Sequence, residues 1–315
     1  MIASWIILIL AFIQWNTMHL YKVMFCFALA CFSSSTYSIE HIIQEKISSL
    51  ISACNLNDGS KCASLGFLYS NGRLVNEDLV KAKYYYNKGC NLDDKSACND
   101  LGFMYAQGHG VEQDFAKAKE LYEKACDLNN GASFINLGIL YEKGNGVAQN
   151  YTKAGELYQK ACSLKYGLGC SNLGFLYQNG LGVKKDLSKT KVFYEEACEL
   201  KDGKGCNNLG FMYQQGTFVD KNLNKAKALY EKSCKLSLGM GCNNLGIMYK
   251  KGNGVKKDPN KALDLYLEAC KLQDGAGCYN LALTFERGES IERDPEKAKV
   301  IYKLSCMLGV KEACE

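Results

Sequence analysis

Cysteine is the residue type in this sequence with the clearest chemical pattern. The chain has 17 cysteines in 315 residues, more than a protein kept in a reducing compartment usually carries. Most of them form pairs with seven residues between the two members, and such regular spacing indicates disulfides or metal sites. The pairs are Cys54 and Cys62, Cys90 and Cys98, Cys162 and Cys170, Cys198 and Cys206, Cys234 and Cys242, Cys270 and Cys278, and Cys306 and Cys314.

Disulfides explain these pairs better than zinc does. Structural zinc needs four ligands, whereas the cysteines come as isolated pairs, and only His41 and His109 lie beyond the N-terminal segment. We therefore predict seven disulfides, no metal site and no cofactor. Cys126 stands where an eighth pair would begin, but Phe134 takes the place of its partner. Cys126 is predicted to be a buried free thiol, with a reactive thiol as the alternative.

A column of polar side chains is the second candidate for chemistry. Leu-Gly recurs every 36 residues from Leu65 to Leu245, and Leu281-Ala282 is the seventh copy. Because an amide offers donors and an acceptor, the residues before these leucines could bind the backbone of an extended peptide, with Asn179 and Gln215 extending the same face. The alternative is that each Asn bonds to the backbone of the preceding unit and stabilises stacking. The column is Ser64, Asp100, Asn136, Asn172, Asn208, Asn244 and Asn280; from Asp100 onward its members are the predicted binding residues.

The elements that position these residues recur with the same period, and each unit is predicted to contain two helices. Cys98, Leu101 and Tyr105 lie at i, i+3 and i+7, on one face of a helix. The neighbouring Phe103 and Met104 are apolar as well, so we expect this first helix to be apolar all round and buried between its neighbours. The glycine after each repeat leucine would let a partner approach closely.

The second helix of each unit is predicted to begin at a capping Asp or Asn. The candidate caps are Asp78, Asp114, Asn150, Asp186, Asn222, Asp258 and Asp294. A second aromatic column, Tyr86, Tyr122, Tyr158, Tyr194, Tyr230, Tyr266 and Tyr302, lies on its buried side.

The predicted fold is all-α, an α/α repeat solenoid with one disulfide per repeat junction. Two helices this short cannot bury their own apolar faces, so neighbouring units must stack and form a superhelix with a concave groove. Residues 39–58 are predicted to be an N-terminal capping helix, and residues 59–315 to be seven repeats.

The N-terminal 38 residues have the composition of an export signal. Two apolar stretches, 2–13 and 23–32, precede a small polar segment, and cleavage is expected after Ser38. Met18 is an alternative start. Two other outcomes stay open, namely an uncleaved membrane anchor and lipoprotein processing at Cys31. The protein is therefore expected to be secreted or periplasmic in a bacterium.

The repeat resembles a known one. The pattern Leu-Gly-x-x-Tyr-x-x-Gly-x-Gly-Val-x-x-Asp-x-x-Lys-Ala, as in Leu101–Ala118, resembles the Sel-one-like (Sel1-like) repeat, a relative of the tetratricopeptide repeat. With the cysteine pairs, residues 40–315 are similar to the Helicobacter cysteine-rich protein family. The departures are Phe134 for Cys, Ala282 for Gly, and the loops at 217–219 and 289–291. The resemblance implies secreted proteins that bind β-lactams and are assigned as weak β-lactamases, on an architecture typical of protein-binding adaptors.

The residues offer little support for β-lactam hydrolysis. A serine enzyme of this kind needs an activated nucleophile such as Ser-x-x-Lys. Ser188 and Lys191 match that spacing once, at the exposed start of a predicted second helix, and no accompanying motif is present. The Tyr-x-Asn matches at Tyr177 and Tyr69 arise from the repeat itself.

The sequence thus favours a disulfide-linked scaffold, expected to be monomeric, whose groove binds a peptide, a protein or a cell-wall fragment; a host protein, peptidoglycan or β-lactams are the candidate partners. The alternatives are a weak β-lactamase and a purely structural envelope protein. The formal net charge is +5, and Lys alternates with Glu and Asp without a basic block. No nucleic-acid-binding surface is expected.

Overall fold

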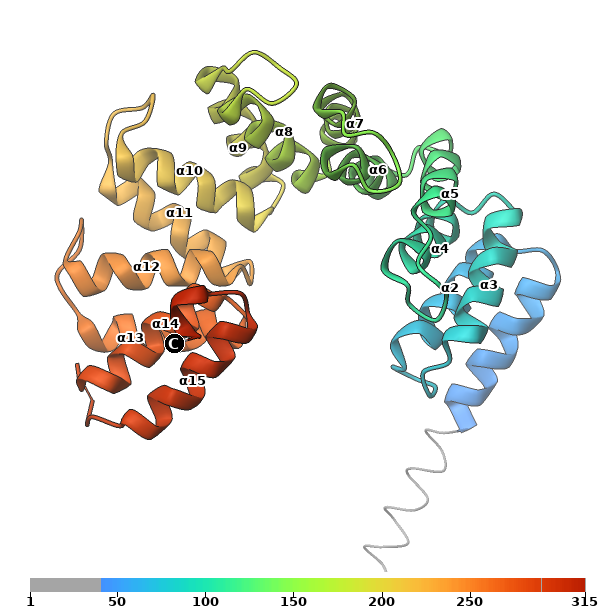
Figure 1. Ribbon diagram of the computed structural model, residues 1–315. Coiled ribbons are helices and arrows are strands. Elements are labelled where there is room, and N and C mark those ends of the chain that lie inside the picture. Colours follow the sequence, from blue (N-terminus) through green and yellow to red (C-terminus); the bar gives the residue numbers. More distant parts are fainter. Residues whose placement is uncertain (1–40, 290, 315) are drawn as a thin grey trace, which may run out of the picture. The chain divides into compact units, whose positions relative to one another are not determined.

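A computed structural model describes residues 41–289 and 291–314 (Figure 1). The expected signal segment, Met18 and Cys31 lie outside the described residues. The chain divides into two compact units, 1–98 and 99–315, and each is considered by itself. The described residues contain no β-strand and no helix long and apolar enough to cross a membrane.

Two series of short helices alternate along the chain, and each helix has 13 residues (Figure 1). The first helices are α2 (Gly59–Asn71), α4 (Lys95–Gln107), α6 (Gly131–Lys143), α8 (Gly167–Asn179), α10 (Gly203–Gln215), α12 (Gly239–Lys251) and α14 (Gly275–Arg287). The second helices are α3 (Leu79–Asn91), α5 (Phe115–Asp127), α7 (Tyr151–Ser163), α9 (Leu187–Glu199), α11 (Leu223–Lys235), α13 (Pro259–Lys271) and α15 (Pro295–Met307). A helix over 41–55 precedes them, and a 3₁₀ turn, η1 (Lys311–Ala313), follows them. This all-α repeat architecture confirms the predicted fold class.

Side-chain caps decide where the second helices begin. The Asp186 carboxylate accepts a hydrogen bond from the backbone N–H of Lys189 at 3.0 Å, which satisfies one of the free donors at a helix start. The other six predicted caps make the equivalent bond. Most first helices end at a glycine in the left-handed region, for example Gly180 with φ of 71°, which residues with a Cβ adopt only at a cost.

In the first six units, the buried tyrosine of the second helix packs on the glycine of its own first helix. At Gly174 a Cβ atom would lie 2.8 Å from the ring of Tyr194, closer than any van der Waals contact allows. Gly102, Gly138 and Gly210 face their own tyrosines in the same way. The absence of a side chain therefore brings the two helices of a unit into close contact.

Stacking continues from unit to unit within residues 99–315. Second helices contact the first helix of the following unit, as α9 does with α10 and α13 with α14. Consecutive first helices also contact each other, from α6 to α14. The outward sides of these first helices consequently form one continuous surface.

Within residues 41–98, the helix over 41–55 packs on α2. Ile47 and Cys54 form a buried cluster with Cys62 and Leu65. The exposed positions of the helix over 41–55 are largely polar, including Ser48, Ser49 and Ser52.

Seven disulfides are present: six join the last turn of one helix to the first turn of the next first helix, and the seventh joins α15 to Cys314, directly after η1. Their Cα–Cα distances run from 4.5 to 4.9 Å. The bridges are Cys54–Cys62, Cys90–Cys98, Cys162–Cys170, Cys198–Cys206, Cys234–Cys242, Cys270–Cys278 and Cys306–Cys314. The α5–α6 junction has no bridge, because Cys126 is a buried free cysteine there and Phe134 replaces the second cysteine.

Candidate functional site

The predicted amide column lies on the first helices, and its six members from Asp100 to Asn280 are half-buried. Three of them reach the first helix of the preceding unit. The Nδ2 of Asn136 donates to the Oδ1 of Asn99 at 2.9 Å, Asn244 donates to Asn207 at 2.8 Å, and Asn280 donates to Asn243 at 2.8 Å. The acceptors Asn99, Asn207 and Asn243 each lie one residue before the amide column in their own units.

Two other members bond to a second-helix tyrosine of the preceding unit, and Asp100 bonds within its own helix. Asn172 makes a hydrogen bond with the Tyr158 hydroxyl, and Asn208 makes one with the Tyr194 hydroxyl. Tyr194 in turn donates to the Oε1 of Gln178 at 2.6 Å. Asp100 accepts from the Nδ2 of Asn99 at 3.0 Å.

These contacts give the column a part in stacking, although by a different route from the one expected. The stacking alternative placed each Asn against the backbone of the preceding unit, whereas the contacts run to side chains: three inter-unit bonds join amide to amide, and those of Asn172 and Asn208 join an amide to a tyrosine hydroxyl. An Asn amide has two N–H donors and an oxygen with two lone pairs. Each inter-unit bond uses one of those donors, so the amides keep hydrogen-bonding capacity toward solvent or a ligand.

An apolar column beside the amides was not anticipated as a functional surface. Phe103, Phe175 and Phe211 lie three residues after their amides and are 45%, 44% and 46% exposed. The prediction that the first helix is buried all round is therefore wrong for Phe103, although Met104 is buried. Ile139, Ile247 and Leu283 hold the equivalent, half-buried positions. The 36-residue recurrence of a large apolar residue was the signal in the sequence.

A third column lies one further helical turn along the same face. It includes the predicted Asn179 and Gln215. All its members within residues 99–315 are exposed: Gln107, Lys143, Asn179, Gln215, Lys251 and Arg287. Asn179 donates its Nδ2 to the Phe175 carbonyl at 2.8 Å. Residues 99–315 thus carry three columns: an amide column, an apolar column and a polar column. We call the surface that these three columns form the ladder face.

Basic side chains outnumber acidic ones on the ladder face. Lys143, Lys251 and Arg287 are exposed on its third column, and only Asp100 in the amide column is acidic. Lys204, one turn before Asn208 on α10, is exposed as well. The Arg287 guanidinium lies 3.7 Å from the Glu289 carboxylate. Because solvent screens such an exposed ion pair, Arg287 still contributes positive charge to the face.

The two candidate catalytic residues lie apart from the ladder face, at the start of α9. Ser188 is exposed. The Nζ of Lys191 lies 3.1 Å from a Glu195 carboxylate oxygen, and the hydrogen bond to Glu195 raises the pKa of Lys191 above its usual value. A general base must lose its proton near neutral pH, so this lysine is poorly suited to activate a serine.

Cys126 lies under a surface cavity at the unbridged junction. The cavity has a volume of about 540 Å³, and Phe134, Lys160 and Leu164 line it with Cys126. The Nζ of Lys160 lies 5.5 Å from the centre of the Phe134 ring. Burial raises the pKa of the Cys126 thiol to about 12, so the nucleophilic thiolate is scarce at neutral pH.

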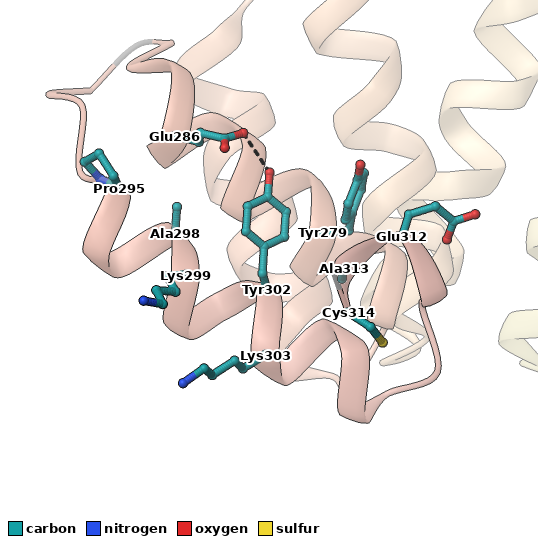
Figure 2. A pocket seen from close by; sticks show the side chains of 10 residues that line it. All are labelled: Tyr279, Glu286, Pro295, Ala298, Lys299, Tyr302, Lys303, Glu312, Ala313 and Cys314. Carbon is teal, nitrogen blue, oxygen red and sulfur yellow. Dashed lines mark hydrogen bonds between the residues drawn. The ribbon is translucent and has the colours of Figure 1, made fainter.

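A second cavity of about 540 Å³ lies at the end of the array, between α14, α15 and η1 (Figure 2). The rings of Tyr302 and Tyr279 line it side by side, with centroids 5.5 Å apart, and the Tyr302 hydroxyl donates to Glu286 at 2.9 Å. At internal junctions the next first helix covers the corresponding tyrosine, as Leu281 covers Tyr266. The cavity follows from the stacking pattern, and its one sulfur, that of Cys314, is held in a disulfide.

One group of metal-ligand type occurs among the described residues. Atoms of Cys162, Cys170 and Glu196 lie within 4.8 Å of one another. The two sulfurs are bonded to each other, and the Glu196 carboxylate accepts from Lys165 at 3.1 Å. A disulfide sulfur is not the thiolate that binds metals, so this group reflects the bridge.

Comparison with known proteins identifies the repeat. The Sel1 repeat model matches residues 62–94, 95–130, 135–166, 167–202, 203–238, 239–274 and 275–310. The chain belongs to the Sel1 repeat family. The resemblance drawn from the Leu-Gly period and the cysteine spacing is thereby confirmed. No curated protein matches the sequence.

Solved structures share the fold of these Sel1 repeats. A Sel1 repeat protein from Oxalobacter formigenes is 29% identical, with a TM-score of 0.64, over 72% of this chain and 93% of that one. A protective antigen with an SLR fold from uropathogenic Escherichia coli is 26% identical, with a TM-score of 0.62, over 86% of this chain. This chain spans 58% of the antigen's length. Helicobacter pylori cysteine rich protein B is 34% identical over 42% of this chain and 95% of that one, with a TM-score of 0.35.

Proposed function

We propose that this Sel1 repeat protein is an exported binding scaffold that takes a peptide or protein ligand on its ladder face. The observation that carries the proposal is the periodic pairing of a half-buried amide with an apolar side chain on consecutive first helices. Asn172 with Phe175 and Asn208 with Phe211 are examples. Amides bind the peptide backbone and exposed rings bind apolar side chains, which together suit an unstructured segment.

The family supports a macromolecular partner. Sel1 repeat proteins generally mediate protein interactions. The continuous surface of first helices in residues 99–315 is where an extended ligand would contact several units at once. Host proteins and peptidoglycan fragments are the candidate sources of such a ligand.

Export is part of the proposal. Seven disulfides are in keeping with an oxidising compartment, because cytosolic reductants would keep most of these thiols reduced. We accordingly assign residues 1–38 to an export signal, 39–58 to a capping helix and 59–315 to the repeats, which places the protein in the periplasm or outside the cell. An uncleaved anchor or lipid attachment at Cys31 would tether the same scaffold to a membrane.

β-Lactam hydrolysis receives less support than binding. Ser188 and Lys191 are the candidates for it, and Lys191 is paired with Glu195. β-Lactams would be ligands of the scaffold in this proposal, bound through their amide and carboxylate groups.

A capture experiment with matched variants tests the proposal. The disulfide-bonded protein is immobilised and exposed to periplasmic extract, host membrane fractions and peptidoglycan fragments. The triple variant Asn172→Ala, Asn208→Ala, Asn244→Ala should lose the captured ligand, while Val192→Ser should retain it, since Val192 is exposed on a second helix. Melting temperatures are measured in parallel. Equal capture by the wild type and the triple variant would contradict the proposal, and a collapse in stability would assign the amides to stacking alone.

A further inference from the structure

The ladder face has a spacing that selects among the conformations a bound peptide can adopt. Consecutive first helices are in direct contact, and amide side chains bond from one to the next, as Asn244 does to Asn207 at 2.8 Å. Helices packed in this way lie about 8–10 Å apart. The apolar column therefore offers one apolar side chain about every 9 Å, exposed at Phe175 and Phe211 and half-buried at Ile139 and Ile247.

A polyproline II peptide matches this spacing. It rises about 3.1 Å per residue with three residues per turn, so every third side chain points the same way after about 9 Å. In a β-strand, side chains on one face recur after about 6.6 Å, and the mismatch grows with every unit. An α-helix would match only at every seventh residue, about 10.5 Å.

The amide column favours the polyproline II form over a helix for a second reason. The backbone of an α-helix uses its own N–H and C=O groups internally, whereas that of polyproline II has no internal hydrogen bonds. Only an extended backbone can use the amide hydrogens that remain on Asn136, Asn244 and Asn280 after their inter-unit bonds. Hydrogen-bonding capacity and spacing thus agree.

The charge of the face limits the composition of the peptide. Lys143, Lys204 and Lys251 are exposed on the first helices, against the single acidic Asp100 of the amide column. Acidic side chains between the apolar ones would complement these lysines and would raise the association rate at low salt.

We infer that the ligand of the ladder face is an acidic peptide in polyproline II conformation that carries an apolar residue at every third position. This inference rests on the proposed function and specifies the class of ligand. Its experiment tests the apolar column and the charge of the peptide, whereas the capture experiment tests the amides.

The probe is a synthetic peptide of five Leu-Glu-Pro triplets, with a fluorescent label, titrated into the disulfide-bonded protein at low salt. Three comparison peptides accompany it. One has the same composition with leucines at alternate positions, one has Lys in place of Glu, and one is a helix-forming peptide with leucine at every seventh position. The triplet peptide is expected to bind at least about tenfold more tightly than each of them, because each of the others loses several apolar contacts or the charge match.

Protein variants locate the binding. The double variant Phe175→Ser, Phe211→Ser should weaken triplet binding about tenfold, while Val192→Ser, an exposed apolar residue on α9, should leave it unchanged. Helix content by circular dichroism should match in all three proteins. Equal binding of the triplet and alternate-position peptides overturns the inference, as does tighter binding of the helical peptide or no binding of any peptide. In those cases, loss of capture by the Asn variant alone would still support the proposed function.

Discussion

At the scale of single residues, Cys126 shows how one substitution changes the chemistry of a junction. Its counterparts at the other junctions are bonded to a cysteine eight positions on, whereas Phe134 fills that place here. The thiol is 8% exposed, and burial raises its pKa to about 12. The same sulfur that cross-links the other units is left here neutral and enclosed.

Alkylation of this thiol should be slow in the folded protein. Because only the thiolate reacts, iodoacetamide at pH 8 should label Cys126 at least about a hundredfold more slowly in the native protein than in the denatured, unreduced one. The rate should rise with pH toward 12, as the thiolate population grows. Mass spectrometry of timed samples measures both rates, and the denatured repeat segment, residues 39–315, should show one labelled cysteine. Rapid native labelling at pH 8 would identify a reactive thiol instead.

At the scale of the helical unit, the glycine after the repeat leucine and the second-helix tyrosine together hold the two helices in close contact. The Tyr194 and Tyr230 hydroxyls each donate to a Gln side chain on their own first helix, at 2.6 Å. Tyr266 lacks such an acceptor among the described residues. The corresponding position is Lys250, which cannot accept a hydrogen bond and instead pairs with Glu289 at 2.8 Å.

Two glycine substitutions separate close packing from helix propensity. Gly174→Ala should destabilise the protein by about 1–3 kcal/mol, because the new methyl group would overlap the buried Tyr194 ring. Gly155→Ala, also within a helix, meets nothing closer than 3.4 Å and should be neutral or stabilising by up to about 1 kcal/mol. Urea titrations of both variants measure the difference. Equal effects would show that the tyrosine contact is unimportant.

In the seventh unit, the natural sequence already has alanine at the position that corresponds to Gly174. Ala282 takes the place of the glycine and is fully buried, and its partner Tyr302 is only half-buried. A ring that is open on one side has room to shift and accommodate a methyl group.

At the scale of the whole molecule, stability comes from a series of junctions that are similar but not equal. In the chain-entropy model a bridge closing so short a ring contributes about 2.5 kcal/mol, less any strain. The α5–α6 junction lacks this contribution. Repeat proteins open at their weakest junction, since each unit contacts only its neighbours.

Hydrogen exchange should reveal this weak point. In the oxidised protein, amides at the α5–α6 junction should exchange about tenfold or more faster than those at the α9–α10 junction, which Cys198–Cys206 bridges. A reductant should bring the two rates closer together and make unfolding by denaturant less cooperative. The α9–α10 junction is an internal control of the same length and helix content. Equal exchange at both junctions before reduction would contradict this account.

Sequence and tertiary structure each determined a separate part of this protein. The 36-residue period, the capping Asp and Asn residues and the cysteine spacing depend on interactions between residues close together in the chain, so the sequence alone predicted the helices, the fold class and the bridges. Which side of a first helix is covered depends on neighbours 36 residues away. For this reason only the structure placed Phe103, Phe175 and Phe211 in solvent and directed Asn136, Asn244 and Asn280 toward side chains of the preceding unit, and these contacts decide what the face can bind.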